Sequence, residues 1–214
     1  MGTLTVDNLN VNSTLTATSG VGKVLQVQQT VKSDTFSTTS ATYVDLTGLT
    51  VNITPTSTSN KILVLVTTNG SAASTYNTMF QLVRDSTEIF KGDTGGGSQS
   101  LASMQARDQD ANTLNSANFN FLDSPSTTSQ VTYKVQAMAQ SGGTSYVNRT
   151  ATDSNSQAIA RIPSSIIVME ISAWTYIKLY EQYITQLLVL MVILKKQLSL
   201  QIVMVKRLQL IGQK

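Results

Sequence analysis

The 214-residue sequence contains no cysteine and no histidine. The missing cysteines exclude disulfide bonds and thiol nucleophiles, and the two absences together exclude zinc sites built from thiolate and imidazole ligands. Imidazole acids and bases are excluded as well, which removes many enzyme mechanisms. We therefore expect a non-enzymatic protein without catalytic residues, metal sites or cofactors.

Charge is scarce and unevenly distributed. Charged residues make up 13% of the chain, whose net charge is +3. Residues 1–173 hold nine Lys/Arg against eleven Asp/Glu, whereas residues 174–214 hold six Lys/Arg against one Glu. Because recognition of nucleic-acid phosphates needs clustered Lys and Arg, we expect no nucleic-acid partner.

Polarity divides the chain into three segments. Residues 1–20 are polar with weakly alternating apolar positions, which predicts an extended N-terminal arm, and their start lacks the features of a secretory signal. Residues 21–173 contain strand-like runs and no helix-period segment, which predicts one β domain. Residues 174–214 form an apolar and basic C-terminal tail.

Seven runs rich in Val, Ile, Thr, Tyr or Phe predict the strands of the β domain. They are KVLQVQQTV, YVDLTGLTVNI, KILVLVTTNG, YNTMFQLVRD, NFNFLD, QVTYKVQAMA and SSIIVMEIS. Long polar connections favour Greek-key or jelly-roll links, so the predicted fold is a mainly β, jelly-roll-like antiparallel β-sandwich. The expected core comprises Leu63, Leu65, Phe80, Leu82, Phe121, Tyr133, Val135, Ile167 and Met169.

Local chemical motifs are weak. DQDAN places Asp108, Asp110 and Asn112 at the first ligand spacings of a calcium loop, but Thr113 and Phe119 occupy its required Gly and Glu positions. A solvated loop is the better interpretation. Carboxylates for glycoside hydrolysis could meet in space, although no local spacing selects a pair. The candidates are Asp85, Glu88, Asp93, Asp108, Asp110, Asp123 and Glu170.

Three stretches carry a resemblance to a known class of proteins. They are GKVLQVQQTVKSDTFSTTSATYVDLTGLTVNITPTSTSNKILVLVTTN (22–69), DSPSTTSQVTYKVQ (123–136) and SSIIVMEISA (164–173). The chain resembles the structural, fibre-type proteins of tailed bacteriophages, especially those of marine bacteria. The resemblance implies a virion component of tail-fibre, head-fibre or decoration type, made in the host cytoplasm. It also implies a β-sandwich head and a homotrimer in contact with the host surface, whose N-terminal arm attaches to other virion proteins.

Two other functions stay open. In a carbohydrate-binding adhesin, exposed aromatic residues such as Tyr76 or Tyr146 would stack on sugars. In a small virion hydrolase, a pair of carboxylates would cleave host polysaccharide. For contact with a host receptor we expect specificity in the loops 91–116 and 141–160, because loops vary while the scaffold holds them.

The tail contains the run LLVLMVILKK (187–196), which invites a membrane interpretation. A membrane span needs ~20 mainly apolar residues. The window Trp174–Leu194 has this length, but it contains charged and amide side chains. We therefore expect no membrane span.

Three further interpretations of the tail remain. Apolar residues follow a coiled-coil heptad, which predicts oligomer contacts at Ile177, Ile184, Leu187, Met191, Leu194 and Leu198. The segment QLSLQIVMV alternates like a strand instead. The tail could also be an out-of-frame extension, because A/T-rich codons for Asn, Thr, Gly and Asp shifted by one base yield Ile, Leu, Val, Met, Lys and Gln. We expect a helix from about Ala173 to Leu194 that contacts other copies of the chain.

Overall fold

The computed structural model describes residues 23–73, 76–94, 97–107, 110–173 and 176–211. The predicted arm, residues 1–20, lies outside the described residues, as does Asp108 of the calcium-like motif. Two separate units are present, and the sandwich unit spans Gly22–Ala173. The second unit includes the C-terminal helix, and each unit is considered by itself.

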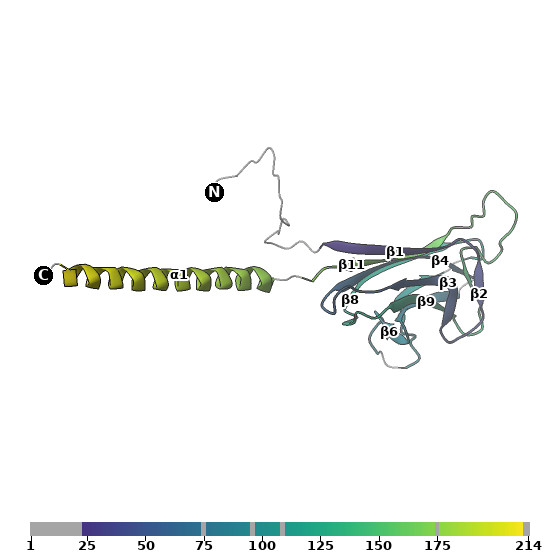
Figure 1. Ribbon diagram of the computed structural model, residues 1–214. Coiled ribbons are helices and arrows are strands. Elements are labelled where there is room, and N and C mark those ends of the chain that lie inside the picture. The colour runs from purple at the N-terminus through teal and green to yellow at the C-terminus, as the bar shows by residue number, and fades with distance from the viewer. Residues whose placement is uncertain (1–22, 74–75, 95–96, 108–109, 174–175, 212–214) are drawn as a thin grey trace, which may run out of the picture. The chain divides into compact units, whose positions relative to one another are not determined.

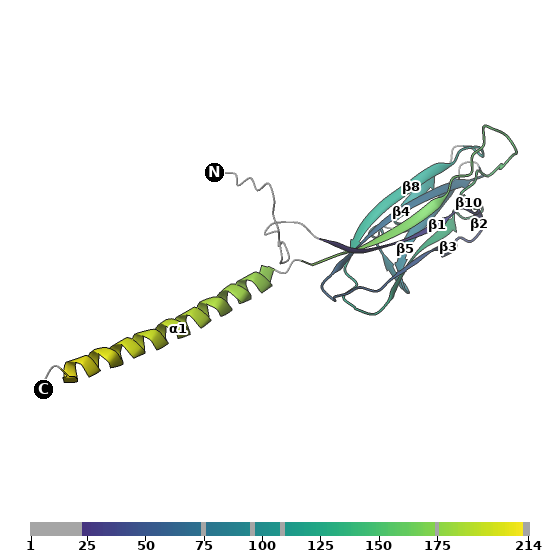
Figure 2. The same ribbon diagram turned by 45° about the horizontal axis from the view of Figure 1, so that its top comes forward.

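The first sheet of the sandwich is built on four long antiparallel strands (Figures 1 and 2). In spatial order they are β1 (Val24–Lys32), β11 (Ser164–Ile171), β4 (Lys61–Ala72) and β8 (Asn115–Asp123). Two short strands extend this sheet where β4 continues past β11. They are β10 (Ser145–Val147), which pairs with β4, and β2 (Phe36–Thr38), which pairs with β10.

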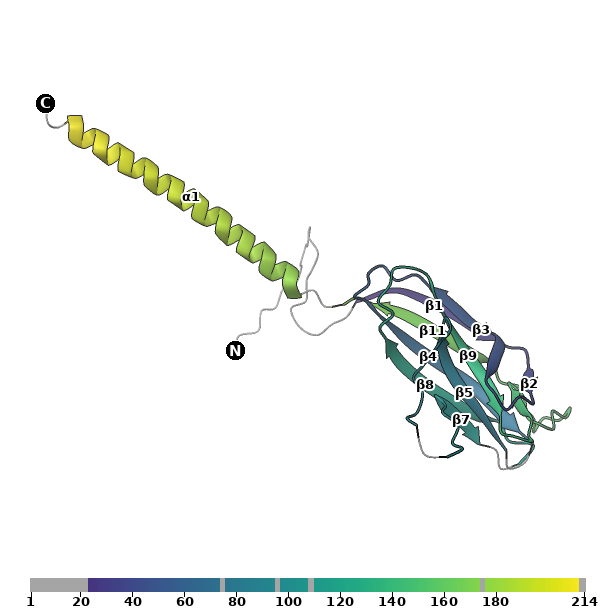
Figure 3. The same ribbon diagram turned by 90° about the horizontal axis from the view of Figure 1, so that it is seen from below.

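The second sheet packs against the first and is seen in Figure 3. Its central strands, in order, are β3 (Val44–Ile53), β9 (Val131–Ala139) and β5 (Asn77–Arg84). The other side of β5 is shared by two short strands, β6 (Thr87–Ile89) and β7 (Met104–Arg107).

Strand order identifies the sandwich as a jelly roll. The first long strand, β1, lies beside the last, β11, and the second, β3, lies beside the second-last, β9. The inner pairs, β4 with β8 and β5 with β7, follow the same nested rule. This nesting is the arrangement of a double-sheet jelly roll. The predicted mainly β sandwich is confirmed.

The core lies between the two sheets. Four of its expected members, Phe80, Leu82, Tyr133 and Val135, are fully buried. Other large contributors include Leu46, Leu49, Ile62, Val64, Ile166 and Val168. Full burial of such a side chain contributes about 1.5–3 kcal/mol, so the sandwich unit has a substantial core of its own.

For β4 and β11, the prediction of which side chains point into the core is wrong. Leu63, Leu65, Ile167 and Met169 are half-buried on the outer face of the first sheet, whereas their neighbours in sequence fill the core. Successive strand residues face opposite sides, so a shift of one residue exchanges the faces. Both strands carry apolar residues on both faces, which leaves no alternation to read. Phe121 is half-buried and packs against the core.

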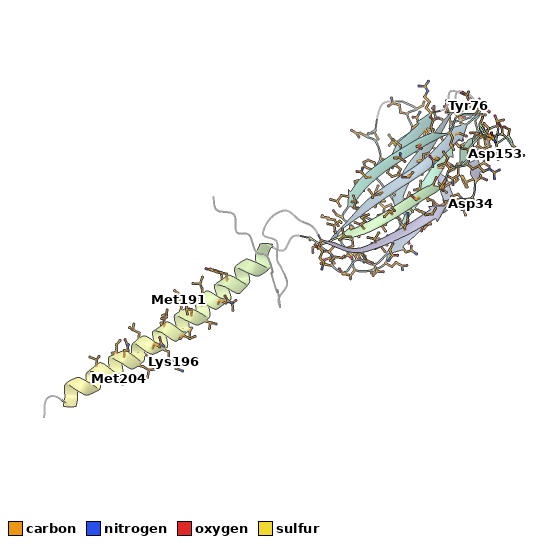
Figure 4. All side chains as sticks on the ribbon, turned by 90° about the horizontal axis from the view of Figure 1, so that it is seen from above. Asp34, Tyr76, Asp153, Met191, Lys196 and Met204 are labelled. Atoms are coloured by element: carbon orange, nitrogen blue, oxygen red, sulfur yellow. The ribbon has the colours of Figure 1, made fainter. Side chains whose placement is uncertain are left out.

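The tail forms one helix, α1 (Tyr176–Ile211), of 36 residues. It runs well past Leu194, so the predicted end of the helix and the strand-like interpretation of QLSLQIVMV are both wrong. A lone strand would leave its backbone groups unpaired, whereas a helix satisfies them internally, and Leu, Met, Gln and Lys favour helix. All described side chains from Tyr183 to Val205 are exposed, including the labelled Met191, Lys196 and Met204 in Figure 4.

Candidate functional site

A hollow of about 590 Å³ lies beside β5 and β7, next to the loop that joins β6 to β7. Its lining is mostly uncharged and polar. Polar side chains come from Asn77, Asp93, Ser98, Gln99, Ser100, Gln105 and Gln140, and apolar ones from Met79, Leu101, Ala102 and Met104. The hollow lies partly in the loop 91–116, where specificity was expected.

Ser103 fixes the end of the β6–β7 loop to β5. Its backbone nitrogen donates to the Phe80 carbonyl (2.8 Å), and its hydroxyl accepts from the Leu82 nitrogen (2.9 Å). The same hydroxyl donates to the Phe90 carbonyl (2.5 Å), so it ties both ends of the loop together. These hydrogen bonds hold the β6–β7 loop, which lines the hollow, against β5.

Tyr43 supports the loop from a neighbouring part of the sandwich. Its hydroxyl donates to the Leu101 carbonyl (2.7 Å). Burial, aided by the charge of Glu88, raises the pKa of Tyr43 to about 12. The phenol is therefore neutral at physiological pH and remains a donor.

Two amides from separate strands meet at the hollow. Asn77 Nδ2 donates to Gln140 Oε1 (2.7 Å), and the Gln140 backbone nitrogen donates to the Asn77 carbonyl (3.1 Å). Asn77 Oδ1 is buried and has no hydrogen-bond partner among the described residues. A buried acceptor without a partner costs ~1–3 kcal/mol. The Asn77–Gln140 pair therefore fixes one edge of the hollow, and Asn77 Oδ1 is a local cost in stability rather than an accessible acceptor.

Asp123, one of the candidate carboxylates, holds the two sheets together. Both of its oxygens accept from Arg84 Nη1 (2.8 and 2.7 Å), and Oδ2 accepts from the Tyr133 hydroxyl (2.6 Å). Burial lowers the pKa of Arg84, but Asp123 raises it more, and burial with the Asp123 charge raises the pKa of Tyr133. These strong contacts give Asp123 a structural role.

Glu170, a second candidate carboxylate, is fully buried and has no cationic partner among the residues that the structure describes. Its Oε1 accepts from the Thr56 nitrogen (2.7 Å), the Thr56 hydroxyl (2.8 Å) and Asn60 Nδ2 (2.6 Å), while Oε2 accepts from Gln26 Nε2 (2.7 Å). Burial raises the pKa of Glu170, but these hydrogen bonds lower it more, so the net shift is downward. The ionised carboxylate joins β1, β11 and the β3–β4 loop.

The remaining described carboxylates also have local partners. Glu88 pairs with Lys91 (2.7 Å), and Asp85 accepts from the Thr132 nitrogen (2.9 Å). Asp110 accepts from a backbone nitrogen in a turn. Within the described ranges, no three or more His, Cys, Asp or Glu residues are grouped closely enough to hold a metal ion.

Glycoside hydrolysis needs two carboxylates on either side of the bond that is cleaved. Among the described residues that line the hollow, Asp93 is the one carboxylate. The arrangement suits binding through hydrogen bonds better than acid–base chemistry.

The two tyrosines proposed to stack on sugars each have a neighbour against the ring. The Arg149 guanidinium lies 4.2 Å from the centre of the Tyr146 ring. The Tyr76 ring lies so close to Gly143 that a Cβ there would approach it to 2.7 Å. Figure 4 places Tyr76 and Asp153 at the same end of the sandwich. The loop 141–160 at this end includes β10 and the ion pairs of Asp153 with Arg149 and Arg161.

The predicted oligomerisation residues all fall within α1. The side chain of Ile177 lies outside the described part, and the other five are between 41% and 60% exposed. Their heptad spacing gives them a common face, but neighbouring faces are equally apolar. Their role in oligomer contacts stays a prediction.

One described helix segment is long and apolar enough to cross a membrane, judged by length and composition alone. It is Tyr183–Val205, with 23 residues, a mean hydropathy of 1.8 and no buried part. This window begins further along the chain than Trp174–Leu194. Lys195 and Lys196 lie close to its centre.

The class of protein defined by these observations is a jelly-roll sandwich with a polar surface hollow and a separate apolar helix. Comparison with protein-family models and with curated proteins finds no match to this chain. The function must therefore be argued from its residues and their geometry.

Proposed function

We propose that the chain is a non-enzymatic structural protein of a bacteriophage virion, of tail-fibre, head-fibre or decoration type, that assembles as a homotrimer. The observation that carries the proposal is the exposed apolar surface of α1, which is separated from β11 by four residues of the sequence. The resemblance to fibre-type phage proteins supports the virion assignment. The jelly roll, a fold found in viral capsid and lectin domains, is compatible with it.

The apolar surface of α1 needs a partner. Burial of each large apolar side chain contributes about 1.5–3 kcal/mol, and α1 exposes such side chains on all sides between Tyr183 and Val205. A membrane would cover them, but a Lys near the centre of a span costs about 2.5–3.5 kcal/mol. Lys195 and Lys196 would both incur this cost. In a helix bundle, their stems can cover apolar surface while the ammonium groups reach water.

Removal of residues 174–214 tests the proposal. We expect the full chain to sediment as a trimer and the shortened chain, which retains the sandwich core, to sediment as a folded monomer. Co-sedimentation with lipid vesicles serves as the control for a membrane anchor. A monomeric full chain, a trimeric shortened chain, or binding of the full chain to vesicles would contradict the proposal.

The virion role has its own test. Antibody labelling of the phage particle that carries this chain should mark the tail tip for a receptor-contacting fibre, or the shell for a decoration protein. The N-terminal arm is proposed to attach to other virion proteins. Particles without label would contradict the assignment to the virion.

A carbohydrate-binding adhesin is the second candidate function, favoured by the polar hollow, whose edge is formed by Asn77 and Gln140. Binding of host-surface glycans should be lost on Asn77→Leu and retained on Asn118→Leu, a change on an exposed position of the other sheet. Equal binding by both variants would exclude the hollow as the glycan site. Release of sugar products from host polysaccharide would instead indicate the hydrolase alternative.

A further inference from the structure

The first sheet has an apolar outer face as well as an apolar inner face. Strand pairing places four outward residues in one row across β1, β11, β4 and β8, namely Val27, Met169, Leu63 and Leu122. The adjacent row places Ile167 beside Leu65, with the polar residues Gln29 and Asn120 at its ends. We call the six apolar residues the outer patch.

The outer patch is open to solvent. Val27 and Leu122, at its two ends, are 50% and 54% exposed, and the four central residues are half-buried. The next row along the same strands is mostly polar, with Ser165, Thr67 and Asn118 beside Val31. Strands that are apolar on both faces are typical of sheets covered on both sides, yet no described element of the sandwich covers this one.

We propose that the outer patch is the surface by which the sandwich contacts other copies of this chain. The proposal rests on the self-association of α1 argued above. β11 ends at Ile171, and α1 begins at Tyr176. Each connecting residue spans at most ~3.6 Å, so helices that bundle hold the Ile171 ends of the sandwiches near one another. The patch row through Met169 lies two residues from that end.

The outer patch is too small to hold copies of the chain together without α1. Its six positions, on strands about 4.8 Å apart and in rows about 7 Å apart, give an area of roughly 200 Å². A stable interface needs about 800 Å² from each partner. The patch therefore does not associate by itself. Tethering by a short linker raises the effective concentration to about the millimolar range, where a weak apolar contact forms.

Two matched double variants of the full chain test the proposal. Val27→Glu with Leu122→Glu places two charges in the outer patch. Val31→Glu with Asn118→Glu places the same two charges on the same strands and face, four residues away in the polar row. Near-UV circular dichroism checks that both variants keep the fold, because all four positions are exposed.

Sedimentation equilibrium then measures the oligomer. We expect the patch variant to dissociate at a concentration at least about tenfold higher than the unchanged chain, because ionised side chains resist burial. The control variant should dissociate like the unchanged chain. If the full chain is an oligomer and both variants behave alike, the outer patch proposal is wrong and the proposed function stands. A monomeric full chain overturns both.

Thiol labelling gives a second, milder measurement because the chain has no cysteine of its own. In the full-chain oligomer, Leu122→Cys should react with a maleimide at least about tenfold more slowly than Asn118→Cys, since the patch excludes water and reagent. Loss of that protection on dilution below the dissociation concentration supports contact between copies. Protection that persists in the monomer points to cover by the chain's own arm and overturns the proposal.

Discussion

Glu170→Ala should strongly destabilise the sandwich unit. The substitution removes a buried carboxylate that accepts four hydrogen bonds from neutral donors on Gln26, Thr56 and Asn60. Two of the donors keep another partner, because Gln26 Nε2 also donates to the Thr54 carbonyl and Asn60 Nδ2 to Thr56 Oγ1. The backbone nitrogen and the hydroxyl of Thr56 lose their acceptor.

Each buried donor left without an acceptor costs ~1–3 kcal/mol, and the lost side chain leaves a gap as well. We therefore expect Glu170→Ala to lower the free energy of unfolding by about 3–5 kcal/mol. Glu170→Gln keeps the volume and one acceptor oxygen, so its cost should be about 1–2 kcal/mol. Glu88→Gln removes an exposed ion pair with Lys91 and should cost less than about 1 kcal/mol.

The contribution of Glu170 should also depend on pH. Its pKa in the folded protein lies below its ordinary value of 4.5. The folded state therefore favours the ionised form, and this stabilisation is fully present above about pH 4.5 and is lost as the pH falls through the folded pKa. The pKa values of Asp34, Asp45, Glu88 and Asp153 are lowered as well. The measured quantity is therefore the difference between the unchanged chain and Glu170→Gln. That difference should shrink on acidification.

Urea unfolding followed by near-UV circular dichroism measures these changes, because the aromatic side chains of Tyr133 and Phe80 are fully buried in the sandwich core. The reasoning is refuted if Glu170→Ala costs less than about 1 kcal/mol, the range of an ordinary surface substitution. It is also refuted if Glu170→Gln and the unchanged chain lose stability in parallel between pH 6 and pH 3.

Three further predictions concern the sandwich. Asp123→Asn should cost about 3–5 kcal/mol in urea unfolding, because it leaves the Arg84 charge without its partner between the sheets. Gly143→Ala should lower the melting temperature, since the added Cβ would lie 2.7 Å from the Tyr76 ring, and Tyr76→Ala in the same chain should relieve that clash. Ile62→Ala should cost about 2–5 kcal/mol by opening a cavity in the core, and a cost below 1 kcal/mol would contradict its assignment to the core.

Much of the fold could be predicted from the sequence because strand composition is a local property. All seven predicted runs became strands, and β1, β3, β4, β5, β8, β9 and β11 are those strands. The short strands β2, β6, β7 and β10 were missed, since three or four residues do not show a period. The sequence did not indicate which side chains of β4 and β11 point into the core, because both faces of these strands are apolar.

The candidate site was largely beyond sequence analysis. Asn77 and Gln140 are 63 residues apart and meet because β5 and β9 are neighbours. Nothing local marks either amide. Part of the loop 91–116 lines the hollow, but its role in specificity stays a prediction. The cation–π contact of Tyr146 with Arg149 could not be predicted, because it depends on how β10 is placed.

The pairing of β1 with β11 determines how the sandwich would respond to mechanical force. Val24, at the start of β1, lies opposite Ile171, at the end of β11, so both strands connect to the rest of the chain at the same end. Pulling these two ends apart would break the hydrogen bonds of the pair one after another, as in a zipper. Pulling on Ile171 against a ligand held at the opposite end, near Asn77, would instead load the bonds on both sides of β11 together, because they lie perpendicular to the strands. The sandwich is therefore weak when Val24 and Ile171 are pulled apart and strong when it is pulled along its strands.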